Sequence, residues 1–320
     1  IAIGLATHGA FFADALGGDL ASKVRGGDDA HGALPGLHLL LLPVLAFPSS
    51  LLLVRALPAA WRDRTAPPTR FLLAWIVPSW IVFECVPTKL PHYTLPLYPA
   101  LFLLTAAWVL DPARRTPPRW LARVSVAAFV GAAVALGGGA AALPFFLERG
   151  FAARDLLGLP ALLAVAATAF MVLRMVRARR FPRAALSGVA GAILVYWSVL
   201  GLELPNLPAL WIAPRVGAVL AAHWPDGRPP GAVFGAAGFH EPSLVFLAGT
   251  DTRLLPTGWD AARLLAGNGD AVAAVGDRDL GAFQEETARL GLRPAEIGTV
   301  AGFNYSRGRP TVLTLFAARP

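Results

Sequence analysis

The sequence predicts a polytopic α-helical membrane protein followed by a small α/β domain. Of its 320 residues, 56% are hydrophobic and 15% are charged, and the mean hydropathy is +0.57. Soluble domains carry about a quarter of charged residues, so a chain of this length and composition has too little polar surface to stay in solution. The single cysteine, Cys85, closes no disulfide within the chain.

Six apolar stretches have the length of membrane-spanning helices, which need roughly 20 mostly apolar residues. They make up a predicted transmembrane region of residues 36–203. An amphipathic segment, residues 1–35, precedes it, and its apolar side chains recur at the spacing of a helix lying on the membrane surface. The six stretches are residues 36–57, 71–87, 94–110, 120–147, 156–176 and 184–203.

Small residues within the spans predict close packing between helices. Helices in lipid have no hydrophobic drive to associate, so they approach one another where glycine, alanine and serine leave room. The fourth and sixth spans carry such residues: Gly131, Gly137, Gly138, Gly139, Ala141, Ser187 and Gly191. This pattern indicates packing rather than a binding site.

The distribution of charge predicts the topology. The formal net charge is +8, and residues 1–203 hold all of this excess, with 18 basic and 10 acidic residues. The connections after the first, third and fifth spans sum to +11, and the alternate segments sum to −3. Because basic connections stay in the cytoplasm, residues 1–35 and the C-terminal region are expected to face the periplasm of a bacterium, with the spans in its inner membrane.

Residues 204–320 have the pattern of a periplasmic α/β domain. Short β-like runs alternate with amphipathic helical segments, as in a sheet covered by helices. Ten basic and ten acidic residues balance there, which argues against nucleic-acid binding. The expected strands are 232–234, 253–255, 271–275, 297–300 and 311–317, and the expected helices are 242–247, 261–266 and 280–290.

The first polar cluster on the outward side precedes the first span. It contains Lys23, Asp28, Asp29 and His31, followed by glycine and proline. Carboxylate and imidazole groups two residues apart are suited to holding a divalent metal ion or binding sugar hydroxyls. A solvated acidic loop with a capping aspartate explains the same residues, and the spacing leaves both interpretations open.

The second cluster is the short connection between the second and third spans. Lys89 is the only cation in this outward hairpin, and His92 and Tyr93 follow it. A lipid phosphate at headgroup depth would pair with Lys89 and accept a hydrogen bond from Tyr93. A lysine that snorkels to the interface, beside an interfacial tyrosine, is the alternative.

The third cluster, residues 238–242, contains His240 and Glu241. These two residues fit the start and cap of a helix as well as they fit a binding site. The sequence contains no nucleophile elbow, Walker loop, zincin motif or paired-cysteine metal site. Nothing in it therefore supports a hydrolase, an ATPase or a metalloprotease.

Three segments resemble a known group of enzymes. PTKLPHYTLPLYPA at 87–100 resembles a signature of bacterial membrane glycosyltransferases related to the lipid A 4-amino-4-deoxy-L-arabinose transferase and, more distantly, to protein O-mannosyltransferases. GGDLASKVRGGDDAHGALPG at 17–36 looks like the periplasmic loop that precedes this signature. FHEPSLVFLAGT at 239–250 and GFNYSRGRPTVLTLF at 302–316 look like the C-terminal soluble domain of the group.

The resemblance implies a GT-C type fold that transfers a sugar from a polyprenyl-phosphate donor to a lipid A-like or protein acceptor at the periplasmic face. It implies that Lys89, Lys23, Tyr93 and His92 bind the phosphate of the donor lipid. Asp29 and His31 would shape the donor pocket or hold a divalent metal, although the reaction itself requires no cofactor. The catalytic aspartate of the group lies upstream of everything present, so we assign no catalytic residue here and expect this segment alone to be inactive.

A function of a different class fits the same residues. The chain would then be a non-catalytic, membrane-anchored module whose periplasmic domain binds a partner enzyme. The coding sequence upstream of Ile1 distinguishes the two hypotheses. Further spans with an aspartate in the first loop would support the enzyme, and a start codon at that point would support the module.

Overall fold

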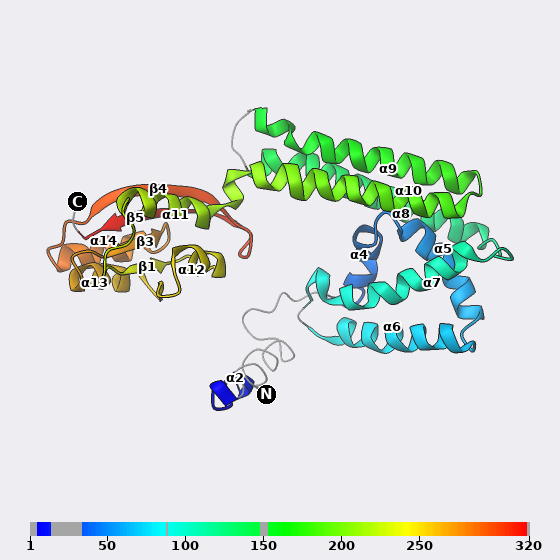
Figure 1. Cartoon of the computed structure of the whole chain (residues 1–320), viewed down its shortest axis with the longest axis horizontal. Coiled ribbons are helices and arrows are strands. Elements are labelled where there is room, and N and C mark those ends of the chain that lie inside the picture. Colours follow the sequence, from blue (N-terminus) through cyan, green and yellow to red (C-terminus); the bar gives the residue numbers. More distant parts are fainter. Residues whose placement is uncertain (1–4, 14–33, 88, 148–152, 319–320) are drawn as a thin grey trace. The chain divides into compact units, whose positions relative to one another are not determined.

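The chain divides into two compact units. The computed structural model describes residues 5–13, 34–87, 89–147 and 153–318 (Figure 1). Residues 1–142 and 158–201 form the first unit, and residues 143–157 and 202–320 form the second. Of the predicted surface helix near the N-terminus, the structure describes only a short piece, α2 (Ala10–Ala13), and residues 14–33 lie outside the described part.

Helices account for most of the chain up to residue 203. Four of them, α6, α7, α9 and α10, have proline in the first turn, where its missing N–H has no helical partner to lose. The helices after α2 in this part of the chain are α4 (Leu37–Leu45), α5 (Ser50–Arg62), α6 (Pro67–Cys85), η2 (Pro91–Leu97), α7 (Tyr98–Leu110), α8 (Arg119–Leu147), η3 (Ala153–Gly158), α9 (Leu159–Arg177), α10 (Phe181–Tyr196) and the π-helical η4 (Trp197–Glu203).

The helical membrane region is confirmed. Within the described residues, four helical stretches are long and apolar enough to cross a membrane: Pro91–Leu110, Arg119–Leu147, Leu156–Arg177 and Phe181–Asn206. There are five if α5 and α6, which meet at an angle of 118°, form one broken span. The predicted first span, residues 36–57, is instead two helices: α4 ends at Leu45, and α5 starts after Pro48, which has no N–H to continue a helix.

The first unit is held together by interlocking apolar side chains. Phe47, in the bend between α4 and α5, stacks on Phe129 of α8 with ring centroids 5.2 Å apart. The same buried cluster includes Leu51 of α5 and Val172 of α9. Large apolar side chains on the outside of α9 and α10, such as Leu163 and Leu186, are mostly exposed, as expected of surfaces that face lipid.

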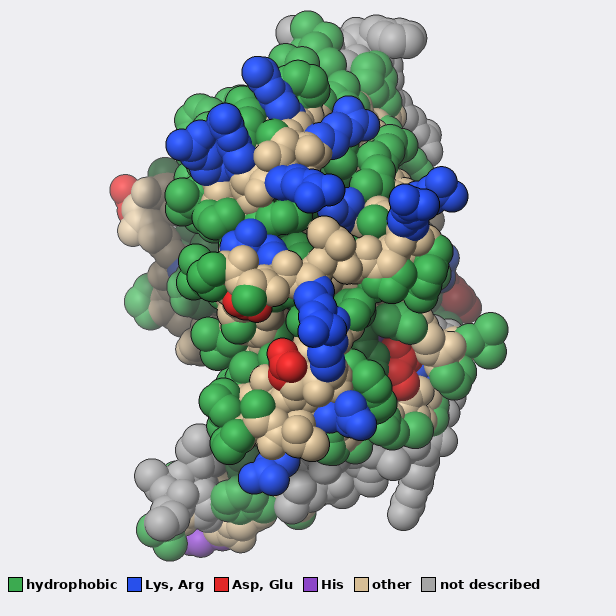
Figure 2. Space-filling view, turned by 90° about the vertical axis from the view of Figure 1, so that its right-hand side faces the viewer, with side chains coloured by type: hydrophobic (Ala, Val, Ile, Leu, Met, Phe, Trp, Pro, Cys, Tyr) green, Lys and Arg blue, Asp and Glu red, His purple; other side chains and the backbone are tan. Residues whose placement is uncertain are grey.

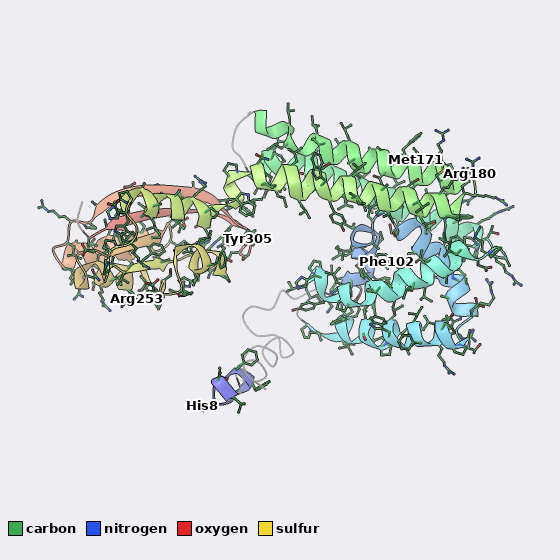
Figure 3. The ribbon with its side chains drawn as sticks, viewed as in Figure 1. His8, Phe102, Met171, Arg180, Arg253 and Tyr305 are labelled. Atoms are coloured by element: carbon green, nitrogen blue, oxygen red, sulfur yellow. The ribbon has the colours of Figure 1, made fainter. Side chains whose placement is uncertain are left out.

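Basic side chains gather at one end of this unit. The connections from α5 to α6, from α7 to α8 and from α9 to α10 lie there, and Figure 2 shows Lys and Arg side chains spread over that end, where Figure 3 labels Arg180. The guanidinium carbon of Arg114, between α7 and α8, lies 5.3 Å from the ring centroid of Phe181 at the start of α10. The formal net charges of these three connections are +3, +3 and +5.

The second unit contains a five-stranded mixed sheet. Its order is β2-β1-β3-β5-β4, in which β1 pairs in parallel with β2 and β3, and β5 runs antiparallel to β3 and β4. The strands are β1 (Phe234–Ala237), β2 (Arg253–Leu255), β3 (Val272–Gly276), β4 (Ala295–Asn304) and β5 (Arg309–Ala317). The α/β domain expected from the sequence is thereby confirmed.

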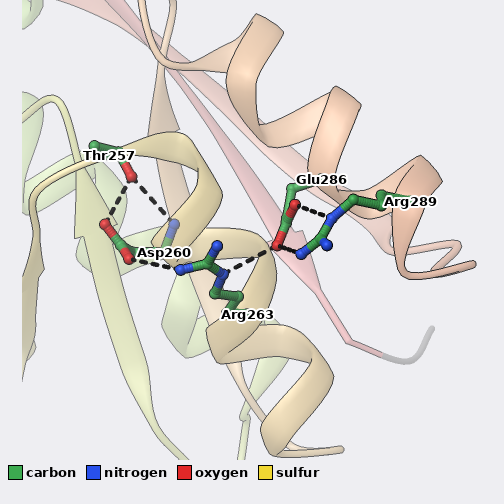
Figure 4. Close-up of polar contacts among 5 residues, drawn as sticks. All are labelled: Thr257, Asp260, Arg263, Glu286 and Arg289. Carbon is green, nitrogen blue, oxygen red and sulfur yellow. Dashed lines mark hydrogen bonds and ion pairs between the residues drawn. The ribbon is translucent and has the colours of Figure 1, made fainter.

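Helices cover both faces of the sheet. One buried cluster joins α11 (Ile212–His223) and α12 (Pro242–Ala248) to one face through Val216, Leu244 and Phe234. A second cluster joins α13 (Gly258–Gly267) and α14 (Leu280–Arg289) to the other face. Figure 4 shows how α13 and α14 are also linked by charge, because Glu286 accepts hydrogen bonds from Arg263 at 3.0 Å and from Arg289 at 2.6 Å.

Candidate lipid-phosphate site

The hairpin that contains Lys89 lies at the end of α6 opposite to the basic connections. α6 begins at Pro67 in the first of those connections and ends at Cys85, and the chain then passes through Lys89 into η2. Pro91 and Pro96 hold η2 in a short 3-10 form before α7 begins. Lys89 therefore stands apart from the gathered arginines of the same unit.

Lys89 is buried rather than extended into solvent. Its side chain is 4% exposed, and Nζ donates a hydrogen bond of 2.7 Å to the carbonyl oxygen of Val86. An ammonium group has three donors, and the described residues occupy one of them in this way. A carbonyl supplies no full negative charge, and no carboxylate in the described part of the chain forms an ion pair with this cation.

A histidine and a glutamate fix the backbone beside Lys89. His38 of α4 is fully buried, and its Nε2 lies 3.1 Å from the carbonyl oxygen of Leu90. Its Nδ1 lies 3.7 Å from Oε2 of Glu84, near the end of α6. Glu84 also accepts hydrogen bonds from the backbone N–H groups of Gly36, at 2.8 Å, and Leu39, at 3.3 Å. A carboxylate that accepts from the first N–H groups of α4 is favourably placed at that helix N-terminus.

Tyr93 and His92 differ in their surroundings. Tyr93 is half-buried, and its ring lies near Phe83, with centroids 6.2 Å apart. His92 is exposed, and its ring meets that of Tyr93 edge to face at 5.2 Å. The structure thus brings together three of the predicted residues, Lys89, His92 and Tyr93, on one short segment.

An open apolar groove of about 550 Å³ begins at the same segment. Leu95 of η2 and Tyr98 at the start of α7 line it, and so do the bend between α4 and α5 and the C-terminal half of α10. Figure 3 labels Phe102, another of its lining residues. A buried cation and a wall of an apolar groove on one short segment form a combination that suits a lipid with a charged head.

Two groups of predicted site residues remain, one before the first span and one in the second unit. Lys23, Asp29 and His31 lie outside the described residues. Within the described part of the chain, no three His, Cys, Asp or Glu residues are grouped so as to hold a metal ion. In the second unit, His240 is exposed with Nε2 2.9 Å from the carbonyl oxygen of Leu255, and Glu241 precedes α12 and accepts a hydrogen bond from Ser306.

Sequence reasoning did not assign His38 and Glu84 to the site. They are 46 positions apart, and each alone resembles a polar residue at the end of a span. A signal was nevertheless present, because a histidine inside a run of leucines and a glutamate near the end of a span both need buried partners. The structure supplies those partners in each other and in the backbone of Leu90.

These features define a polytopic membrane protein that carries a small α/β domain and a cationic hairpin beside an apolar groove. Comparison with solved structures narrows this class. The fold is similar to that of ArnT from Cupriavidus metallidurans, crystallised with undecaprenyl phosphate, with a TM-score of 0.52 and 16% identity over 89% of this chain and 52% of that one.

Curated sequences agree with this likeness. The chain is 42% identical over 92 residues to the undecaprenyl phosphate-alpha-4-amino-4-deoxy-L-arabinose arabinosyl transferase of Pectobacterium carotovorum, which is 28% of this chain and 16% of that protein. It is 35% identical over 131 residues to the enzyme of the same name from Pectobacterium atrosepticum, covering 38% of this chain and 23% of that protein. No family model matches the chain.

Sequence and fold together confirm the predicted resemblance to the aminoarabinose transferase group of membrane glycosyltransferases. The likeness extends over part of each relative only. The aligned regions cover less than a quarter of either curated relative, and the chain spans about half the length of the solved structure.

Proposed function

We propose that this chain forms the C-terminal part of a membrane glycosyltransferase that takes a sugar from a polyprenyl-phosphate donor and passes it to a lipid A-like or protein acceptor. The observation that carries the proposal is the buried Lys89, which forms no ion pair among the described residues and lies on the segment from which Leu95 lines an apolar groove. The groove would hold part of the prenyl chain. The likeness to proteins named for undecaprenyl phosphate-linked aminoarabinose transfer supports the same donor class.

The proposed mechanism assigns Lys89 to the departing phosphate. When the bond between the sugar and the phosphate breaks, negative charge grows on the phosphate oxygens, and a fixed cation in a water-poor site stabilises that charge. Tyr93 would donate a hydrogen bond to the same phosphate, with His92 and Lys23 as further donors. His38 and Glu84 act indirectly, because they hold the backbone of Leu90 and the start of α4 in place.

The decisive experiment replaces Lys89 in the complete protein. Lys89→Ala should lower sugar transfer from a polyprenyl-phosphate donor by roughly 100- to 1000-fold, the cost of losing one donor to a developing oxyanion. Lys89→Arg should restore part of the activity. Arg119→Ala, which removes an exposed cation at the basic end, is the matched control and should leave turnover unchanged. Equal turnover for Lys89→Ala and the control would refute the assigned role.

The proposed orientation places the Lys89 hairpin and the second unit in the periplasm, with the basic connections in the cytoplasm and the spans in the inner membrane of a bacterium. The positive-inside rule supports it. Cys85 is exposed at the end of α6 beside this hairpin. With other cysteines of the full-length protein replaced, a membrane-impermeant maleimide should label Cys85 in intact spheroplasts. A cysteine at Arg180 in a Cys85→Ser background should be labelled only after permeabilisation, and the reverse pattern would overturn the orientation.

A divalent ion held by Asp29 and His31 stays a prediction. In an Asp29→Asn, His31→Ala double variant, sugar transfer should no longer depend on added divalent cations. Adding Lys89→Arg to this variant should still lower transfer as it does in the parent protein. If chelators affect the parent protein and this variant equally, these two residues hold no functional ion.

A further inference from the structure

The second unit has a hairpin that projects beyond its sheet. β5 pairs with β3 only from Leu313 to Ala317, whereas β4 and β5 stay paired as far as Asn304 and Arg309. The outer part of this hairpin lies against the segment by which the chain enters the unit. A Cβ atom on Gly302 would collide with Ile212 and with the carbonyl oxygen of Ala209. The hairpin tip and the chain entry are therefore at the same end of the unit, where Figure 3 labels Tyr305.

Large apolar and aromatic side chains are exposed at this end. Trp211, Leu247 and Tyr305 line one cavity of about 110 Å³, so they are neighbours in space although they come from three separate segments. Their exposed fractions are 44%, 48% and 64%, and Phe246, beside Leu247 on α12, is 85% exposed. These four residues form what we call the aromatic face. Large exposed apolar side chains gathered at one end of a unit are typical of a site of interaction with another protein or with a membrane.

The aromatic face is tied directly to a membrane-spanning helix. The apolar helical stretch Phe181–Asn206 ends five residues before Trp211. The indole Nε1 of Trp211 donates a hydrogen bond of 2.7 Å to the carbonyl oxygen of Leu204, in the last turn of that stretch. Trp211 is thus held at the point where the span ends, which is the depth at which tryptophan and tyrosine gather in membrane proteins.

The charges around this face suit anionic headgroups. Arg307 is exposed in the hairpin turn and Arg309 follows it, and within the described residues neither forms an ion pair. Arg215 donates to the carbonyl oxygen of Ala301 on the same hairpin, and Glu241 is the nearby carboxylate, accepting from Ser306. Basic side chains are attracted to a membrane surface that contains anionic lipids.

We propose that the aromatic face inserts into the headgroup layer of the bilayer that the preceding span crosses. Phe246 and Leu247 reach the boundary of the acyl chains, Trp211 and Tyr305 lie at headgroup depth, and Arg307 and Arg309 pair with lipid phosphates. The second unit is then held against the membrane by its own side chains as well as by its covalent connection. This inference rests on the membrane span and on the second unit, and it does not depend on the proposed transferase activity.

Spin labelling tests the proposal in the full-length protein. Phe246→Cys is made in a background in which Cys85 and any other cysteine are replaced by serine, labelled with a nitroxide, and reconstituted in vesicles of phosphatidylethanolamine and phosphatidylglycerol. Oxygen concentrates in the bilayer and a neutral nickel chelate stays in water, so the ratio of their collision rates reports depth. We expect oxygen collisions to dominate at position 246.

Leu290→Cys is the matched control. Leu290 is an exposed apolar residue just after α14, on the other face of the sheet, where nickel collisions should dominate. A second labelled variant, Tyr305→Cys, guards against a local failure to fold at 246. Adding Arg307→Ala and Arg309→Ala should reduce the oxygen collisions at 246. Nickel-dominated collisions at both 246 and 305 would overturn the proposal. Spin–spin broadening at 246 that disappears on dilution with unlabelled protein would also overturn it, because it would show that a second copy covers the face.

Discussion

Replacing Gly191 by alanine tests whether helix packing in the first unit depends on single missing methyl groups. Gly191 lies in α10, and a Cβ atom built on it would overlap the side chain of Thr168 in α9. Thr168 has little freedom to move away, because it is 4% exposed and its hydroxyl donates a hydrogen bond of 2.6 Å to the carbonyl oxygen of Ala164. Either that hydrogen bond breaks or the two helices separate.

The expected cost follows from these contacts. Overpacking of a well-filled interior costs about 1–3 kcal/mol. Replacing glycine by alanine within a helix also stabilises the folded state by roughly 0.5–1 kcal/mol, because alanine has less backbone entropy to lose. Alanine substitutions at two other glycines measure this entropic gain without a clash. Gly138 in α8 has nothing within 4 Å of its Cβ position, and at Gly188 in α10 the nearest atom is 3.4 Å away, in ordinary contact.

Thermal unfolding of the purified protein in detergent, followed by loss of the monodisperse peak, measures the difference. The free energy of unfolding of Gly191→Ala should be about 1–3 kcal/mol lower than that of Gly138→Ala. For a unit of this size, that difference lowers the unfolding midpoint by roughly 2–12 °C. Gly188→Ala should resemble Gly138→Ala. Adding Thr168→Ala to Gly191→Ala should recover part of the loss, as expected of residues in direct contact. Equal midpoints for the Gly191 and Gly138 variants would refute the reasoning.

Two further predictions concern the second unit. Hydrogen bonds from Arg289 and Arg263 lower the pKa of Glu286 from 4.5 to about 2, so its contribution to stability is complete above about pH 5 and is lost as the pH falls towards 2. Hydrogen exchange of the α13 and α14 amides should therefore accelerate over that interval, and Glu286→Gln should flatten the pH profile; an unchanged profile would contradict the assignment. Phe283→Ala, which empties a fully buried site stacked on Phe316 at 4.6 Å, should cost about 3–5 kcal/mol of unfolding free energy. Phe246→Ala, at an exposed site, should cost less than 1 kcal/mol in detergent, and similar losses for the two variants would argue against the described core.

Local sequence predicted those elements whose stability comes from local patterns. The strand expected at residues 253–255 has those bounds in the structure, and the helix expected at 280–290 runs from Leu280 to Arg289. The strand expected at 297–300 was too short, since β4 extends from Ala295 to Asn304. Apart from Phe303, its residues outside 297–300 are polar or small. They are extended because each pairs with a residue of β5, and local hydropathy does not reveal that pairing.

Hydropathy also did not register the break in the first predicted span. Residues 36–57 are mostly apolar, so a hydropathy window over them indicates one helix. Proline at position 48 ends the run of N–H donors, and α5 then turns back to pack on the buried Phe129 cluster. The break has a consequence for the site, because residues 45–49 of this bend form one wall of the apolar groove. Sequence periodicity alone therefore predicted the helices and missed the surface that their interruption creates.

The surroundings of Lys89 separate two explanations for its position. In the sequence it is a cation on the wrong side of the membrane, which a lipid phosphate and simple snorkelling explain equally well. Snorkelling places the ammonium in water, whereas this side chain is buried and bonded to Val86. The nearby carboxylate, Glu84, is already engaged by His38 and by the first N–H groups of α4. Among the described residues Lys89 forms no ion pair, so in the proposed function a lipid phosphate would supply its counter-ion, and the apolar groove that Leu95 of the same segment lines would hold the hydrocarbon chain of that lipid.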